Sequence, residues 1–191
     1  MDLMKLMKER YSCRRFAEKP VPREVIRTIL EAGRVAPTAH NEQPQRILVI
    51  DEKETLEKLD RCTKCRFGAP AALLVCYDKT ACWHRTKYDN APSGEVDVGI
   101  VTTHMMLMAY SLGIGTTWVM HFDPAAVRSE FALPDSYEPT AILVMGYPAA
   151  DASPAPAHAE NKPMEQLVCY NKFWEKNGRT GAEGDAPALF L

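Results

Sequence analysis

The sequence predicts an α+β domain in which helices flank a small sheet. Three apolar runs, at 47–50, 71–77 and 140–145, have the length and composition of strands. No strand is followed by a glycine-rich turn that opens a helix, and the one Gly-x-Gly, at 113–115, closes a helix instead. These features disfavour the doubly wound nicotinamide-binding fold. With 191 residues, of which 46% are hydrophobic, the chain is long enough to bury a sizeable core.

The charge balance and the cysteines narrow the class of protein. The net charge is -2, from 23 Lys+Arg and 25 Asp+Glu, which argues against a polybasic surface for nucleic acid. The six cysteines are spread through a chain that is large enough to be stable without disulfide bonds. We therefore expect reduced thiols and a cytoplasmic location. Residues 98–115 are apolar enough to resemble a membrane span. Their hydroxyls and histidine favour a buried helix, and no membrane partner is expected.

Helical periodicity accounts for the first part of the chain. Leu3, Leu6 and Met7 share one face of an N-terminal helix, and a polar, basic segment follows it. A second helix is expected from Arg23, with apolar residues at helical spacing, and Pro37 ends it. The elements expected next are a polar loop at 37–44, a buried strand at 47–50, a charged surface helix at 52–61 and a strand at 71–77.

The second half begins with a long loop and ends in a segment of low complexity. The elements expected in order are a loop at 78–95, a helix at 96–112 buried on all sides, an extended segment at 116–120, a helix from 124 to 131 and a strand at 140–145. Asp123 and Pro124 are typical of a helix start. Beyond Pro148 the Ala- and Pro-rich stretch should run extended, and a helix is expected at 164–170.

A basic cluster near the N-terminus could bind an anion. Arg10, Ser12 and Arg14 alternate along one side of an extended segment, and Arg15 adds another guanidinium. Guanidinium groups bind phosphate through paired hydrogen bonds, and a hydroxyl can donate to a phosphate oxygen. The alternative is a solvated basic loop that binds nothing.

Two loops carry other polar groups. The 37–44 loop supplies carboxamides, which can bind the edge of a heterocycle because each is both donor and acceptor. It could equally be a connection rich in turn-forming residues. Trp83, His84 and Arg85 could line a substrate mouth or could be ordinary surface residues.

The cysteine pair Cys62-x-x-Cys65 invites a metal or redox interpretation. Cys76 and Cys82 would complete a set of four thiolates. However, Cys76 lies in an apolar strand, where cysteine acts as a small hydrophobe, and the chain has no second Cys-x-x-Cys. We therefore expect no metal site.

Taken together, separated motifs resemble the FMN-dependent nitroreductase family. They are RYSCRRF at 10–16, APTAHNEQPQRILVI at 36–50, HMMLMAYSLGIGTTWVMHF at 104–122 and ILVMGYP at 142–148. The resemblance implies an FMN cofactor and a three-layer sandwich with a mixed, mainly antiparallel sheet flanked by helices. It also implies an intimate homodimer with FMN at the interface. One domain would cover 1–170, with an extended arm at 149–162, and a tail would cover 171–191.

The resemblance also assigns the cofactor contacts to three segments of the chain. It implies that the phosphate and the flavin edge are held by Arg10, Tyr11, Ser12 and Arg14. It implies that the flavin of the other subunit is reached by Pro37, Thr38, Ala39, Asn41 and Gln43. The residues implied to lie along the ring are Thr117, Trp118 and Val119. Lys162 is the one basic residue left to complete the phosphate site, and the nearby Glu160 is unfavourable there. Either Arg15 supplies the missing positive charge at the phosphate site or FMN binds less tightly.

The activity implied is that of an oxidoreductase. It would take hydride from NADH or NADPH at flavin N5 and pass electrons to a nitroaromatic, a quinone or a related small-molecule oxidant by a ping-pong mechanism. No catalytic acid or base is required. Two alternatives stay open. One is a reductase of the same fold that dehalogenates or saturates an activated C=C bond. The other is an FMN-binding redox sensor that uses Cys62 and Cys65.

Overall fold

A four-stranded sheet with the order β1-β2-β4-β3, antiparallel throughout, forms the middle layer of the structure. We describe residues 2–173 from a computed structural model. The strands are Gln45–Ile50 (β1), Ala71–Asp78 (β2), Gly115–Val119 (β3) and Tyr137–Gly146 (β4). The helices are Leu3–Glu9 (α1), Arg23–Arg34 (α2), Lys53–Cys62 (α3), Gly94–Ser111 (α4) and Pro124–Glu130 (α5).

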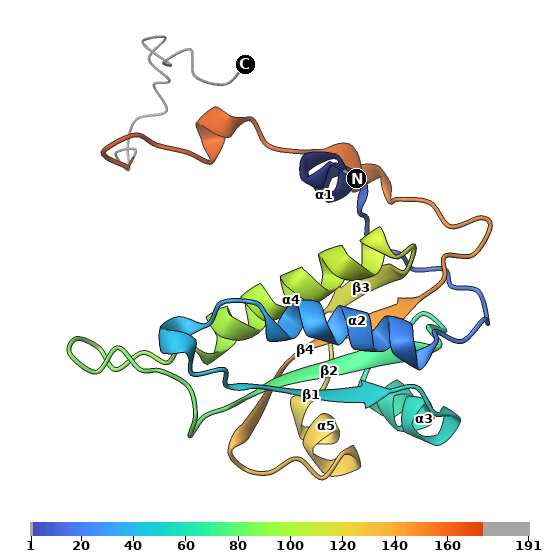
Figure 1. Cartoon of the computed structure of the whole chain (residues 1–191), viewed down its shortest axis with the longest axis horizontal. Helices are drawn as coiled ribbons and strands as arrows, with labels where there is room; N and C mark the ends of the chain where they lie inside the picture. Colours follow the sequence, from blue (N-terminus) through green and yellow to red (C-terminus); the bar gives the residue numbers. More distant parts are fainter. Residues whose placement is uncertain (1, 174–191) are drawn as a thin grey trace. The chain divides into compact units, whose positions relative to one another are not determined.

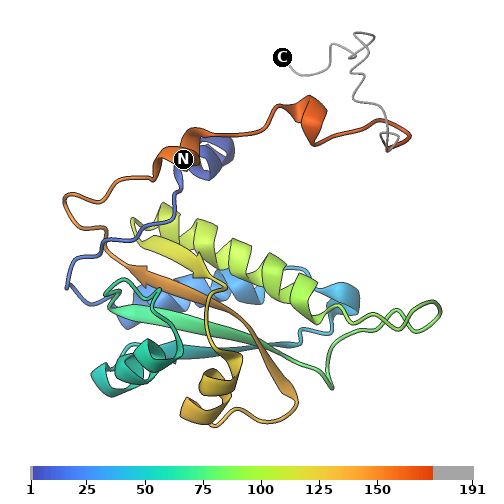
Figure 2. The same ribbon diagram turned by 180° about the vertical axis from the view of Figure 1, so that it is seen from behind.

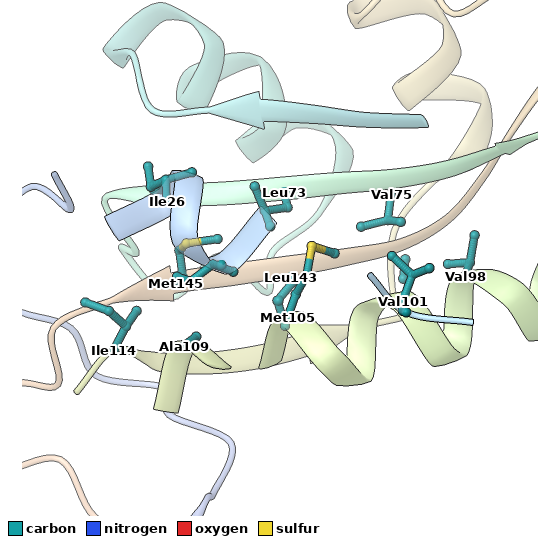
Figure 3. Packing of buried hydrophobic residues seen from close by; sticks show 14 of the residues in the cluster. Ile26, Leu73, Val75, Val98, Val101, Met105, Ala109, Ile114, Leu143 and Met145 are labelled. Atoms are coloured by element: carbon teal, nitrogen blue, oxygen red, sulfur yellow. The ribbon is translucent and has the colours of Figure 1, made fainter. Parts of the chain in front are cut away.

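The two central strands bury side chains on both faces of the sheet. Leu73 and Leu143 face α2 and α4, where they pack with Met105 (Figure 3). Leu74 and Ile142 face the opposite way, toward α3 and α5. Helices therefore cover both faces of the sheet, as Figures 1 and 2 show. The predicted three-layer α+β sandwich is confirmed, although the sheet is antiparallel rather than mixed.

Local signals begin and end the helices as predicted. The Asp123 side chain accepts hydrogen bonds from the backbone N–H groups of Ala125 and Ala126, at 2.9 and 3.2 Å, and so caps α5. Gly113, with φ of 76°, follows the end of α4 in the left-handed conformation that glycine adopts most easily.

Two elements are less buried than the sequence predicted. The strand at 47–50 was expected to be buried, but β1 is an edge strand and Leu48 is 41% exposed. The helix at 96–112 was expected to be covered on all sides, but α4 packs on α2, the sheet and α1 and leaves part of its surface uncovered. Val96 is 66% exposed, and Ile100, Thr103 and Leu107 are half-buried. Because these residues recur at helical spacing, they form an outward stripe on α4 that is mainly apolar.

The chain divides into two compact units, Met1–Ala155 and Pro156–Leu191, so the predicted arm at 149–162 spans the boundary. The helix expected at 164–170 is wrong, because only a 3₁₀ turn forms there, at Met164–Gln166. All side chains of this segment except the half-buried Cys169 are exposed, and so short a helix gains too little without a packed face. The predicted tail falls mostly outside the described residues. Within them, no helix is long and apolar enough to cross a membrane.

Candidate functional site

The basic N-terminal segment runs along the open edge of β3 and then past the end of β4. The backbone N–H of Cys13 donates to the carbonyl of Thr116 at 2.9 Å, and the Thr117 hydroxyl donates to the carbonyl of Cys13. Further along, the N–H of Ala17 donates to the carbonyl of Tyr147 at 2.9 Å. Cys13 is fully buried, so it anchors the segment while its neighbours on either side remain accessible.

Gly115 permits this close approach. A Cβ atom added there would lie 2.8 Å from the Cβ and 2.9 Å from the Sγ of Cys13, and 3.1 Å from Pro148. Both short distances are below normal van der Waals contact, so only glycine allows the segment to pack on the strand. The Gly-x-Gly at 113–115 thus ends α4 and also allows the basic segment to pack against β3.

Arg10 and Arg14 keep their charges available for a ligand. Within residues 2–173 neither guanidinium has an ion-pair partner, whereas most other arginines pair with a carboxylate. Arg15, proposed above to compensate in a phosphate site, pairs with Asp151 at 2.5 Å instead. Lys162 is exposed and lies in the second unit. The segment therefore presents two unneutralised cations beside the half-buried Ser12.

The open edge of β3 offers a backbone donor next to this segment. The Thr116 carbonyl points toward Cys13 and so away from β4. Alternate residues of a strand direct their backbone groups to the same edge, so the N–H of Trp118 also points away from β4. Of the three residues predicted to lie along the ring, Thr117 and Val119 have buried side chains, and Trp118 is half-buried and therefore the most accessible.

The loop at 37–44 adopts an unusual backbone. His40, Asn41 and Gln43 have φ values of 52°, 58° and 50°, in the left-handed region that costs most non-glycine residues about 1 kcal/mol or more. The Thr38 hydroxyl accepts a hydrogen bond from the N–H of Gln43 at 3.1 Å. Asn41 and Gln43 are exposed. Strain of this kind concentrates at functional sites, because the surrounding structure must hold it.

A buried carboxylate that the sequence analysis did not single out holds this loop. Asp97, in the first turn of α4, is 1% exposed and accepts hydrogen bonds from the N–H of Ala39 at 2.8 Å and from the Ser93 hydroxyl at 2.7 Å. An acidic residue at the start of an otherwise apolar helix was the signal that could have identified it. Asp97 therefore ties the loop to the N-terminal end of α4.

We predict that Asp97→Ala destabilises the protein by about 3 kcal/mol, because two donors to a buried charge lose their acceptor. Urea unfolding measures this loss. Asp97→Asn keeps an acceptor oxygen for Ala39 and should cost less than half as much. Equal losses in the two variants would show that the carboxylate itself, and not the acceptor geometry, determines the stability.

The predicted cofactor residues fall into two groups at opposite ends of α4. The basic segment contacts β3 near the C-terminal end of α4, and β3, which carries Trp118, packs against that helix, whereas the 37–44 loop contacts the first turn of α4 (Figure 1). A helix of 18 residues is about 27 Å long, which exceeds the length of one FMN molecule. Within a single chain the two groups of predicted residues therefore do not meet.

Cys62, the first residue of the Cys62-x-x-Cys65 pair, lacks the features of a reactive thiol. Cys62 is 4% exposed, its thiol donates to the carbonyl of Lys58 at 3.4 Å, and burial raises its pKa. Burial also raises the pKa of Cys76, to about 11. Thiols of this kind are poor nucleophiles at neutral pH. Among the described residues, no three metal-ligating side chains lie together.

Comparisons with known proteins found several relatives of this chain. A model of the nitroreductase family matches residues 7–67 and 60–147. A nitroreductase family protein from Clostridium difficile is 41% identical, with 91% of this chain and 100% of that chain covered and a TM-score of 0.85. A Desulfovibrio desulfuricans structure in complex with FMN is 28% identical, with coverages of 91% and 98% and a TM-score of 0.75. A Thermus thermophilus protein named NADH dehydrogenase is 28% identical, with coverages of 85% and 92%.

Proposed function

This chain belongs to the nitroreductase family, and we propose that it is an FMN-dependent oxidoreductase that transfers electrons from NADH or NADPH to a small-molecule acceptor. The observation that carries the proposal is the pair of unneutralised guanidiniums, Arg10 and Arg14, that β3 holds beside an open strand edge. The FMN complex of the Desulfovibrio relative and the NADH named for the Thermus relative support it.

The residues present fit FMN. Arg10, Ser12 and Arg14 supply the charge and hydroxyl that a phosphate monoester requires, in a segment whose backbone is fixed by β3. Arg14 would also place positive charge where it favours electron uptake by the cofactor. The Trp118 amide would orient the ring. When bound, FMN supplies the electron-transfer chemistry, and the protein supplies binding, orientation and polarity.

We also propose that the working form is a homodimer whose two FMN sites lie at the interface. In one chain the two half-sites lie too far apart for one cofactor, so a second copy has to bring the 37–44 loop of one chain to the basic segment of the other. The outward stripe on α4 offers an apolar surface for that contact, because Val96, Ile100 and Leu107 are covered only in part by their own chain.

We predict that Leu107→Glu weakens the dimer by on the order of 100-fold, because the substitution places an unpaired carboxylate in the apolar contact. Sedimentation velocity over a range of protein concentrations measures the effect, and FMN content should fall with the dimer. A matched change on an exposed face of another helix, Thr28→Glu in α2, should leave both unchanged. A Leu107→Glu protein that stays dimeric would exclude α4 from the interface.

The visible spectrum of the purified protein tests the proposed function. We expect a flavin spectrum that bleaches on anaerobic addition of NADH or NADPH and returns when a nitroaromatic or quinone is added. Initial velocities against both substrates should give parallel double-reciprocal lines, because donor and acceptor would use the same open face in turn. A protein that stays colourless after addition of FMN would contradict the proposal.

A further inference from the structure

We infer that the stacked rings of His40 and Trp83 form one wall of the acceptor site and select planar aromatic acceptors over saturated ones. The ring centroids lie 5.2 Å apart, and the planes are only 9° from parallel. His40 is exposed and Trp83 is half-buried, so the stack turns an aromatic face outward. The inference rests on the proposed function, in which the 37–44 loop reaches the cofactor of the other chain.

The position of His40 in the chain places the stack beside the cofactor. His40 lies between Ala39 and Asn41, two residues of the loop that the proposed dimer brings to the flavin. Its left-handed backbone, with φ of 52°, turns its side chain onto Trp83, which belongs to the long loop between β2 and α4. The two rings therefore join a cofactor-binding loop to a segment whose role the sequence left open.

One carboxylate holds both loops in place. Asp97 accepts from the N–H of Ala39, next to His40, and from the hydroxyl of Ser93. The N–H of Ser93 in turn donates to the carbonyl of Trp83 at 2.8 Å. Because both ring-bearing segments are tied to the same buried side chain, the stack is formed before any ligand arrives, and a ligand does not have to order it.

A preformed aromatic face distinguishes flat ligands from puckered ones. An aromatic ring gains an offset stacking interaction on such a face in addition to its area of contact. A saturated ring of the same size and charge gains the contact but not the stacking. The His40–Trp83 stack therefore selects a flat, conjugated acceptor ring over a saturated ring of the same size.

The test uses a pair of ligands that cannot be reduced. Calorimetric titration of the FMN-loaded protein with benzoate and with cyclohexanecarboxylate compares a flat ring with a puckered ring of the same charge. We expect tighter binding of benzoate, and we expect His40→Asn to reduce the ratio of the two affinities by roughly three- to tenfold. Asparagine tolerates the left-handed backbone, so this variant removes the ring and keeps the loop. Trp83→Leu should also reduce the ratio, whereas Trp83→Phe should keep it.

The possible outcomes separate this inference from the proposed function. An FMN-loaded His40→Asn protein whose affinity ratio equals that of the wild type overturns the aromatic wall alone. A His40→Asn protein that loses FMN also overturns it, because His40 would then position the cofactor instead. A wild-type protein that binds no FMN overturns the proposed function and the inference together.

Discussion

Replacing Arg14 by alanine is expected to weaken FMN binding by about 1.5–3 kcal/mol, the usual scale for a charge-assisted hydrogen bond. Arg10→Ala should have an effect of similar size. Both side chains lie on the segment that β3 fixes through Cys13 and Thr116, and neither charge is neutralised within residues 2–173. The quenching of FMN fluorescence during titration of the apoprotein gives the dissociation constants.

The neighbouring arginine supplies a matched control. Arg15 carries the same side chain on the same segment, but its guanidinium pairs with Asp151 at the surface. Because Asp151 already compensates the charge of Arg15, Arg15→Ala should leave FMN affinity nearly unchanged. Equal losses in Arg14→Ala and Arg15→Ala would mean that general charge, rather than a specific site, attracts the cofactor. Full FMN retention in both Arg10→Ala and Arg14→Ala would mean that the phosphate lies elsewhere.

Gly115→Ala is expected to displace the basic segment from β3 and to lower both stability and FMN affinity. The new methyl group would lie 2.8 Å from the Cβ of Cys13, and overpacking of this kind costs about 1–3 kcal/mol. Because Arg10 and Arg14 flank the displaced contact, the loss of FMN affinity should exceed the loss predicted from stability alone. Thermal unfolding and FMN titration measure the two effects separately.

A second substitution tests the cause of this effect. Cys13→Gly removes both atoms of Cys13 that the new methyl group would meet, so the double variant should bind FMN better than Gly115→Ala alone. If Cys13→Gly restores no FMN affinity to Gly115→Ala, the contact between Gly115 and Cys13 does not position the basic segment.

Short-range signals predicted most of the fold. The apolar runs gave the three strands, and the pair Asp123 and Pro124 gave the start of α5, because these signals depend on neighbouring residues only. Errors arose where burial depends on distant parts of the chain. Leu48 lies in a run of apolar residues, which does not reveal that β1 is at the edge of the sheet. The apolar pattern of α4 likewise does not reveal that part of its surface is uncovered in a single chain.

The candidate site was predictable only in part. Spacing alone placed Arg10, Ser12 and Arg14 on one side of an extended segment. The carboxamides made the 37–44 loop a second candidate, which the resemblance assigned to the cofactor. Neither could show that the two groups lie at opposite ends of α4, because that depends on the packing of the whole domain. Two contacts are long-range and have no local signature. They are the ion pair of Arg15 with Asp151 and the hydrogen bond from the Ala39 N–H to Asp97.

Mixing two defective variants tests the central claim, that each FMN site takes one half from each of two chains. Arg10→Ala/Arg14→Ala lacks the phosphate half, and Asn41→Ala/Gln43→Ala lacks the loop half. Coexpressed at equal levels, the two chains should form mixed dimers that each contain one intact site. About a quarter of the wild-type FMN content is then expected at a concentration where neither variant alone binds FMN. If each site were built within one chain, the mixture would bind no FMN, and the account would be contradicted.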